Sequence, residues 1–269
     1  MIREAKFAGF FYPKSKKEIE KVLKDFFEKV KLDKIKEEII GIIVPHAGYI
    51  YSGLTATYAY SLLPKNIFRA VIIGPNHTGL GKEVSVFYKG KWKTPLGEVE
   101  VDENFSKKVI ENSLFAKEDF EAHLEEHSIE VQVPFLQFLY KNNFKIVPIC
   151  LMNQSISVAK DLANALVKTN EEFLLIASSD FTHYENYASV NEKDEKLIDA
   201  IISLDLEKFY KTINKWKISA CGYGAIAVLM EITKILGGKI KLVKHSTSAE
   251  VSKDYLNVVG YASLISFKE

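Results

Sequence analysis

Cysteine is scarce in this chain, since Cys150 and Cys221 are the two cysteines among 269 residues. Two cysteines cannot build the disulfide framework that small secreted domains need. Methionine and tryptophan are also rare, with three and two copies. Lys, Glu and Ile are abundant instead, and this balance is typical of thermophile proteins.

A surplus of charge of either sign is also missing, because 36 basic residues face 35 acidic ones and the net charge is +1. This balance argues against nucleic acid and against an anionic membrane surface as partners. No apolar run approaches the length of a membrane span, and residues 1–13 lack the apolar core of a signal peptide. We therefore expect a cytoplasmic protein. Because no linker, repeat or low-complexity tract interrupts the chain, we expect one domain over residues 1–269.

Strand-like and helix-like segments alternate along the chain, which predicts a three-layer α/β/α fold with a mixed, mainly parallel sheet. A hairpin over 84–101 and two final strands supply the antiparallel part. The expected strands are 41–46, 69–75, 145–151, 173–177, 239–245 and 257–267. The expected helices are 15–30, 52–63, 103–112, 127–142, 155–169, 192–204, 206–216 and 222–236.

Two histidines follow predicted strands in the same context. Gly41 to Val44 is apolar and runs into Pro45-His46-Ala-Gly48, and a second apolar run ends in Pro75-Asn-His77-Thr-Gly79. In open α/β sheets, ligands bind in the crevice beyond the carboxyl ends of the strands. We therefore expect His46 and His77 to line one site, with the glycines allowing a ligand close to the backbone.

A third strand end carries Ser178-Ser-Asp180-Phe-Thr-His183-Tyr. An Asp and a His three residues apart can meet, with the carboxylate fixing the tautomer of the imidazole. The simpler alternative is an Asp that caps a helix beside a surface histidine.

The segment from His123 to Glu130 holds two histidines and three carboxylates, but it does not read His-Glu-x-x-His, so a zinc-protease helix is excluded. An apolar run follows directly and should pull Glu126, His127 and Glu130 inward. We expect these three residues to line the pocket, together with Tyr49 and Asn76, which neighbour the two strand-end histidines.

Cys221 precedes an apolar helix, in Ser219-Ala-Cys221-Gly-Tyr-Gly. The positive end of a helix dipole favours a thiolate, so Cys221 could be a nucleophile, a soft metal ligand or a small buried residue at a turn. Cys150 lies inside an apolar strand and should be buried and inert.

With these segments in view, the sequence resembles the Memo family, in the branch called AmmeMemoRadiSam system protein B. The resemblance spans nearly the whole chain in order. It rests on Phe10-Phe-Tyr-Pro13, Pro45-His46-Ala-Gly48-Tyr49, Gly74-Pro-Asn-His77, Thr94-Pro-Leu-Gly97, Glu126-His127-Ser-Ile-Glu130, Ser178-Ser-Asp180-Phe-Thr-His183-Tyr184, Cys221-Gly222 and Val259-Gly260-Tyr261.

That family is similar in fold to class III extradiol dioxygenases of the protocatechuate 4,5-dioxygenase type, which hold Fe(II) with two His and one Glu. By resemblance, His46 and His77 take the two His positions, Cys221 takes the Glu position, and His183 is the acid–base residue beside Asp180. The resemblance implies Fe(II) or copper as the cofactor, with zinc also compatible. A thiolate is softer than a carboxylate, so cleavage of a catechol ring does not follow.

Three functions remain open on the sequence. The first is a metal-dependent oxidoreductase. The second is a metal-free hydrolase or transferase with Cys221 as nucleophile, His183 as base and Asp180 as its orienter. The third is a non-catalytic module whose crevice binds a peptide or small molecule.

Overall fold

The computed structural model describes residues 1–33 and 35–268, so the domain predicted over 1–269 includes two positions outside the described residues. The strands are β1 (Ile2–Arg3), β2 (Glu38–Val44), β3 (Arg69–Pro75), β4 (Val84–Val86), β5 (Lys91–Thr94), β6 (Gly97–Val101), β7 (Ala116–Glu118), β8 (Lys145–Leu151), β9 (Leu174–Ser178), β10 (Lys239–Thr247) and β11 (Gly260–Lys268).

The helices lie between these strands. They are α1 (Lys16–Lys29), α2 (Leu54–Tyr60), α3 (Glu103–Asn112), α4 (Glu121–Leu124), α5 (Val133–Tyr140), α6 (Ile156–Lys168), α7 (Tyr187–Ile202), α8 (Leu206–Trp216), α9 (Tyr223–Ile235) and α10 (Ala249–Ser252). A short π-helix, η1 (Tyr49–Gly53), leads into α2, and a 3₁₀ turn, η2 (Glu130–Gln132), leads into α5.

Within the described residues, the strands form one sheet in the order β1-β5-β6-β8-β3-β9-β2-β11-β10; β4 pairs with β8, and β7 pairs with β4. The four central strands β8, β3, β9 and β2 are mutually parallel, so their carboxyl ends lie at the same edge. The pairs β10–β11, β11–β2, β5–β6 and β4–β8 are antiparallel. The predicted mixed, mainly parallel sheet is confirmed.

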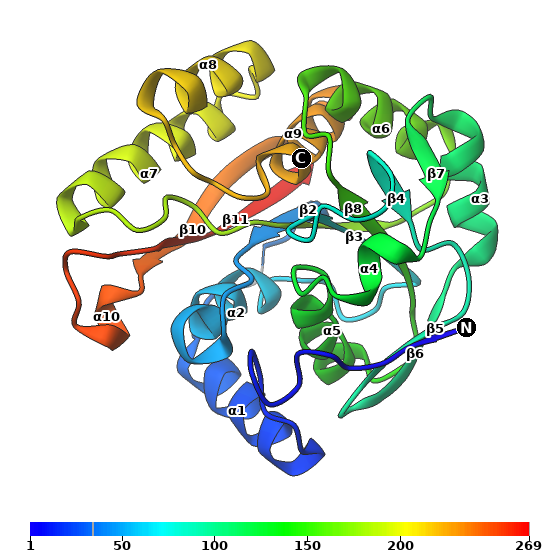
Figure 1. The fold of residues 1–269 in the computed structure, drawn as a ribbon, viewed down its shortest axis with the longest axis horizontal. Coiled ribbons are helices and arrows are strands. Elements are labelled where there is room, and N and C mark those ends of the chain that lie inside the picture. Colours follow the sequence, from blue (N-terminus) through cyan, green and yellow to red (C-terminus); the bar gives the residue numbers. More distant parts are fainter. Residues whose placement is uncertain (34, 269) are drawn as a thin grey trace.

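Helices cover both faces of this sheet (Figure 1). The helices α1, α2 and α5 lie on one face, and α3, α6, α7, α8 and α9 lie on the other. The neighbours Ile42 and Ile43 of β2 belong to separate hydrophobic clusters, one on each face. Because successive side chains of a strand point to opposite faces, a strand covered on both faces must be apolar throughout. This is why the run before His46 is uninterrupted.

Several predicted boundaries shift. Helix α1 is confirmed, and the hydroxyl of its cap Ser15 accepts the Glu18 N–H. The helix expected over 127–142 is instead η2 followed by α5, with Pro134 in the first turn of α5, where a missing N–H is tolerated. Helix α7 begins earlier than expected because the Asn186 side chain accepts the Ser189 N–H. The hairpin is β5–β6 only, and it joins the sheet through β8.

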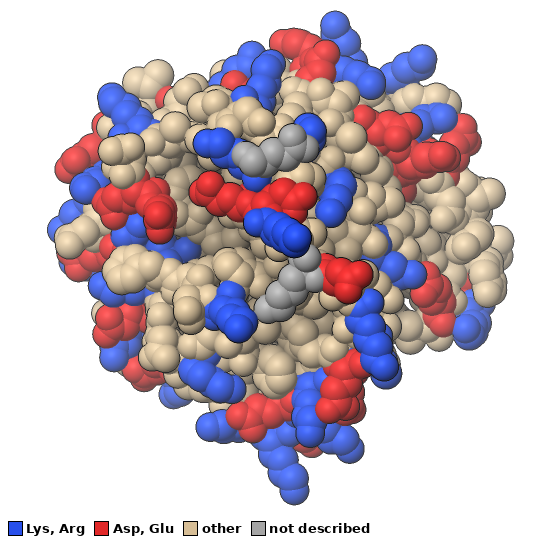
Figure 2. Space-filling model, turned by 180° about the vertical axis from the view of Figure 1, so that it is seen from behind, with Lys and Arg blue, Asp and Glu red and all other residues tan. Residues whose placement is uncertain are grey.

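The surface carries both signs of charge. Figure 2, which views the molecule from behind relative to Figure 1, shows Lys and Arg interspersed with Asp and Glu, in keeping with the net charge of +1. Among the described helices, none is long and apolar enough to cross a bilayer. The cytoplasmic location expected from the sequence stays a prediction.

Candidate functional site

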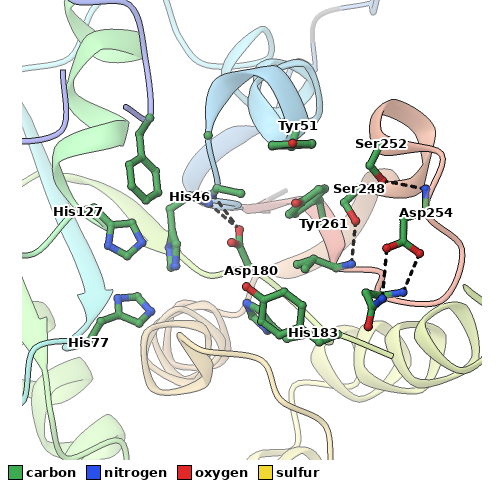
Figure 3. Close-up of a pocket in the computed structure, with 16 residues that line it drawn as sticks. His46, Tyr51, His77, His127, Asp180, His183, Ser248, Ser252, Asp254 and Tyr261 are labelled. Carbon is green, nitrogen blue, oxygen red and sulfur yellow. Dashed lines mark hydrogen bonds between the residues drawn. The ribbon is translucent and has the colours of Figure 1, made fainter. Parts of the chain in front are cut away.

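A cleft of about 630 Å³ lies beyond the carboxyl ends of β2, β3 and β9. Figure 3 shows His46, His77 and His127 grouped at one end of the cleft and Tyr51, Ser248, Tyr261 and Asp254 toward the other. The carboxylate of Asp180 lies between the two ends. His183 also lines the cleft.

The tautomer of His46 is set by its neighbours. The Ser178 hydroxyl donates to the Ser128 carbonyl at 2.7 Å and accepts from Nε2 of Gln132 at 2.8 Å. Because the single hydroxyl proton is already used, the 2.9 Å contact between Ser178 Oγ and His46 Nδ1 requires Nδ1–H as the donor. The Nε2 atom of His46 is therefore left with a free lone pair. Burial, and the nearby charge of His77, lower the pKa of His46 to about 3, so the ring is neutral near pH 7.

His77 is held by Glu126 at two atoms. The Nδ1 of His77 lies 2.8 Å from Glu126 Oε1, and its backbone N–H donates to Oε2 at 2.6 Å. Burial lowers the pKa of His77, but the hydrogen bond and the charge of Glu126 outweigh it, so the pKa is raised overall. Burial raises the pKa of Glu126, but its contacts with His77 prevail and lower it to about 2. This carboxylate–imidazole contact leaves Nε2 of His77 as the free ring nitrogen.

Cys221 brings its sulfur to the free nitrogen of His46. The Sγ lies 3.1 Å from His46 Nε2, and the backbone N–H of Asp180 donates to Sγ at 3.3 Å. Burial, followed by the charge of Asp180, raises the pKa of this half-buried thiol far above its usual value. The expectation that the helix dipole ionises Cys221 in the free protein is therefore wrong. The helix α9 begins at Tyr223, and loss of hydration outweighs its dipole.

These three side chains form one group. One ligand atom each from His46, His77 and Cys221 lie within 4.8 Å of one another. Two imidazole nitrogens and one sulfur suit zinc, copper or iron. The donor set therefore fits the metals that the resemblance implies. A second group, His77, Glu126 and His127, also has ligand atoms within 4.8 Å of one another, but the Glu126 oxygens already accept the ring and backbone N–H of His77.

His127 lines the cleft as expected, and it is packed between two rings. Its ring stacks on His77 with centroids 4.6 Å apart and lies 4.5 Å from the ring of Phe11. Burial, followed by the charge of His46, lowers the pKa of His127 to about 3. Phe11 belongs to Phe10-Phe-Tyr-Pro13, one of the segments that carry the family resemblance, and no sequence pattern linked it to a site.

The expected contact between Asp180 and the His183 ring is corrected by the structure. The Oδ1 atom of Asp180 accepts the backbone N–H groups of His46 and Ala47, at 2.8 and 3.2 Å. The Nδ1 of His183 instead donates to the Ser219 carbonyl at 2.9 Å, and no described residue hydrogen-bonds its Nε2. Burial raises the pKa of Asp180 above its usual value, against the opposing charge of His183.

Four of the residues expected to line the pocket are not among the residues that line the cleft. The Asn76 side chain accepts the N–H groups of Thr78 and Gly79 and so shapes the turn that presents His77. Glu126 is fully buried behind His77. The buried Glu130 pairs with Arg3 and accepts from the Tyr12 hydroxyl. Tyr49 donates to the Val131 carbonyl and borders a separate apolar hollow.

The distal end of the cleft was missed from the sequence. It is formed by segments of β11, of η1 and of the loop around α10, which carry no ligand-type pattern, and by Tyr184 from the loop after β9. The residues missed there are Tyr51, Tyr184, Ser248, Ser252, Asp254, Asn257 and Tyr261. Only Tyr261 and Tyr184 occur in segments noted for the family resemblance.

The chain has near full-length relatives among known proteins. The chain is 46% identical, over 99% of both chains, to a MEMO1 family protein of Thermoplasma acidophilum. It is 44% identical to a MEMO1 family protein of Thermotoga maritima, over 99% of this chain and 100% of that one. The crystal structure of the uncharacterized protein JW3007 from Escherichia coli K12 aligns with 84% of this chain and 99% of its own, at a TM-score of 0.57 and 12% identity. That likeness concerns the fold alone.

The family model described as Memo-like protein matches residues 3–265. Together with the near full-length relatives, this match confirms the resemblance drawn from the sequence: the chain belongs to the Memo family.

Proposed function

We propose that this protein is a metal-dependent oxidoreductase in which His46, His77 and Cys221 hold iron or copper. The observation that carries the proposal is the 3.1 Å approach of Cys221 Sγ to the unprotonated Nε2 of His46, with His77 completing a group within 4.8 Å. Zinc fits the same donors, so the identity of the metal is itself part of the proposal.

The neighbouring groups support this role because they fix each ligand from behind. Ser178 holds Nδ1 of His46, and Glu126 holds Nδ1 of His77, so both free Nε2 atoms are available to one ion. The Asp180 N–H donates to the Cys221 sulfur. Such donors stabilise a thiolate once a metal has displaced its proton.

When bound, a redox-active metal would supply electron transfer to or from a substrate in the cleft. The chain would supply binding, orientation and proton movement. The half-buried His183 borders the cleft, and no described residue hydrogen-bonds its Nε2, so this nitrogen is placed to exchange a proton with a substrate hydroxyl or amine. Phe11, packed on His127, would limit the access of water to the ligand end.

The metal-free hydrolase alternative is weaker. Its base was expected to be His183, but His46 is the histidine in contact with the sulfur. Its thiol also has a pKa raised by burial, which disfavours the nucleophilic thiolate. The non-catalytic alternative, a small-molecule or peptide binding module, is supported by the volume of the cleft. We propose that the protein acts in the cytoplasm, as the sequence predicts.

The test is anaerobic loading with Fe(II), Cu(I) or Zn(II), followed by removal of free metal and measurement of bound metal. Oxygen uptake is then measured with a panel of reduced phenols, thiols and amines. We expect one metal per chain and uptake that Cys221→Ser removes. A stoichiometric metal without any uptake would leave a binding module, and no retained metal would reject the proposal.

A further inference from the structure

The cleft is lined by two carboxylates and by histidines, but by no lysine or arginine among the described residues. The two carboxylates are Asp180 and Asp254. Lys253 precedes Asp254, but its ammonium donates to the Glu250 carbonyl and it does not line the cleft. A site for a phosphate or carboxylate ligand normally offers Arg or Lys, so an anionic ligand meets no permanently charged cation here.

Asp180 is the central feature of this charge pattern. It is 5% exposed and still borders the cleft. Its Oδ1 atom accepts both backbone N–H groups from the segment after β2, whereas no donor among the described residues pairs with Oδ2. Figure 3 shows the carboxylate between the histidine end and the tyrosine end of the cleft. A carboxylate removed from water in this way is stabilised by a cationic or hydrogen-bonding partner.

Three tyrosines from separate elements surround the same space. Tyr51 comes from η1, Tyr261 from β11, and Tyr184 from the loop after β9. Tyr184 is 74% exposed, and its φ of +55° places it in the left-handed region, which non-glycine residues rarely adopt. The faces of tyrosine rings attract ammonium groups, and several rings around a carboxylate are a recurrent way to bind amines.

We propose that the cleft takes a substrate with a protonated amine, whose ammonium group lies against Asp180 among Tyr51, Tyr184 and Tyr261. This inference deepens the proposed function. It rests on that function only in placing the end of the substrate opposite the amine at the metal ligands. Asp254, at the rim, favours the approach of a cation, because it is ionised and exposed.

The test compares three probes that share a phenol ring with a two-carbon unit attached to it and differ in the group that this unit bears. Tyramine carries a cation, 4-ethylphenol is neutral, and 3-(4-hydroxyphenyl)propionate carries an anion. Their affinities for metal-free protein are measured by titration calorimetry at neutral pH and low salt. We expect tyramine to bind about tenfold or more tighter than 4-ethylphenol, and the anion to bind weakest, since a hydrogen bond to a charged group has about that effect.

Two matched variants locate the charge. In Asp180→Asn the amide oxygen can still accept the two backbone N–H groups, but the charge is gone, so the preference for tyramine should fall to about twofold or less. Asp254→Asn should reduce it only modestly, because exposed charges interact weakly.

The results separate this inference from the metal proposal. Equal affinities, tighter binding of the anion, no binding of any probe, or an unchanged preference in Asp180→Asn would each overturn it. Cys221→Ser should lose metal but keep the preference for tyramine, so failure of the metal site alone leaves this result standing. The probe series on the unmodified protein remains decisive even if Asp180→Asn does not fold.

Discussion

The Nε2 atom of His46 and the sulfur of Cys221 lie 3.1 Å apart, although 175 positions separate them in the chain. They meet because β2 ends beside β9, and the turn before α9 returns to the same sheet edge through the backbone contact of Cys221 with Asp180. A thiol proton fits between the two atoms in the free protein, and a metal ion would take its place.

Replacement of single histidines should separate ligands from the acid–base residue. We expect His46→Ala or His77→Ala to lose most metal, because each removes one of three donors. His183→Ala should retain it, since the free nitrogen of His183 is outside the ligand group. Bound metal per chain after desalting measures this. Equal loss in His183→Ala would show that its role is wrongly assigned.

Acid should destabilise the protein through Glu126. Its folded pKa of about 2 lies below the ordinary 4.5, so its stabilising effect is complete above pH 4.5 and is lost as pH falls toward 2. The shift corresponds to roughly 3 kcal/mol of unfolding free energy. We expect Glu126→Gln to flatten the pH dependence of urea unfolding between pH 5 and 2. The variant should also bind metal about tenfold to a hundredfold more weakly, because His77 loses its orienting carboxylate. If the unfolding free energies of the unmodified protein and of Glu126→Gln changed equally between pH 5 and 2, Glu126 would not be the source of the acid sensitivity.

Alkylation of Cys221 should be slow near pH 7 even without metal, because burial raises its pKa and the thiolate is the reactive form. A Cys150→Ser background leaves Cys221 as the thiol that can react. In this background, iodoacetamide should modify the folded protein at least about tenfold more slowly than the urea-unfolded chain, because a difference of one pKa unit changes the thiolate fraction about tenfold. The rate should rise with pH beyond the range where an ordinary thiol levels off. Added Zn(II) should slow it further. Rapid labelling at pH 7 that zinc does not affect would favour a reactive nucleophile instead.

Much of this site could be predicted from the sequence because it is encoded locally. An uninterrupted apolar run followed by Pro and His predicts a buried strand whose end faces the crevice, and this holds for both His46 and His77. The pairing of Asp180 with backbone N–H groups could not be predicted, since it depends on how β9 lies beside β2. Local spacing suggested His183 as the partner of Asp180, but the His183 ring donates its hydrogen bond to the Ser219 carbonyl instead.

The acidity of Cys221 was predicted in the wrong direction because sequence position shows the helix dipole but not the loss of hydration. The tyrosine end of the cleft was missed for a related reason. Tyr51 and Tyr261 come from elements about two hundred positions apart, and only the sheet order brings them together. Burial and long-range packing are the properties that a local pattern does not carry.

Substitution of the thiol should change the choice of metal. Cys221→Glu would replace sulfur by a harder oxygen, so we expect Fe(II) binding to persist. The affinity for Cu(I) should fall by about tenfold or more, because this soft ion loses its soft ligand. Competition titrations with a chelator for each ion measure both affinities. Unchanged Cu(I) affinity would mean that copper does not use the sulfur.

The central claim is that His46, His77 and Cys221 bind one ion together. X-ray absorption at the zinc edge of stoichiometrically loaded protein tests it directly. We predict one sulfur at about 2.3 Å and nitrogen neighbours at about 2.0–2.1 Å, with the sulfur contribution absent in Cys221→Ser. A loaded protein whose spectrum contains only nitrogen and oxygen neighbours, and does not change in Cys221→Ser, would contradict the account.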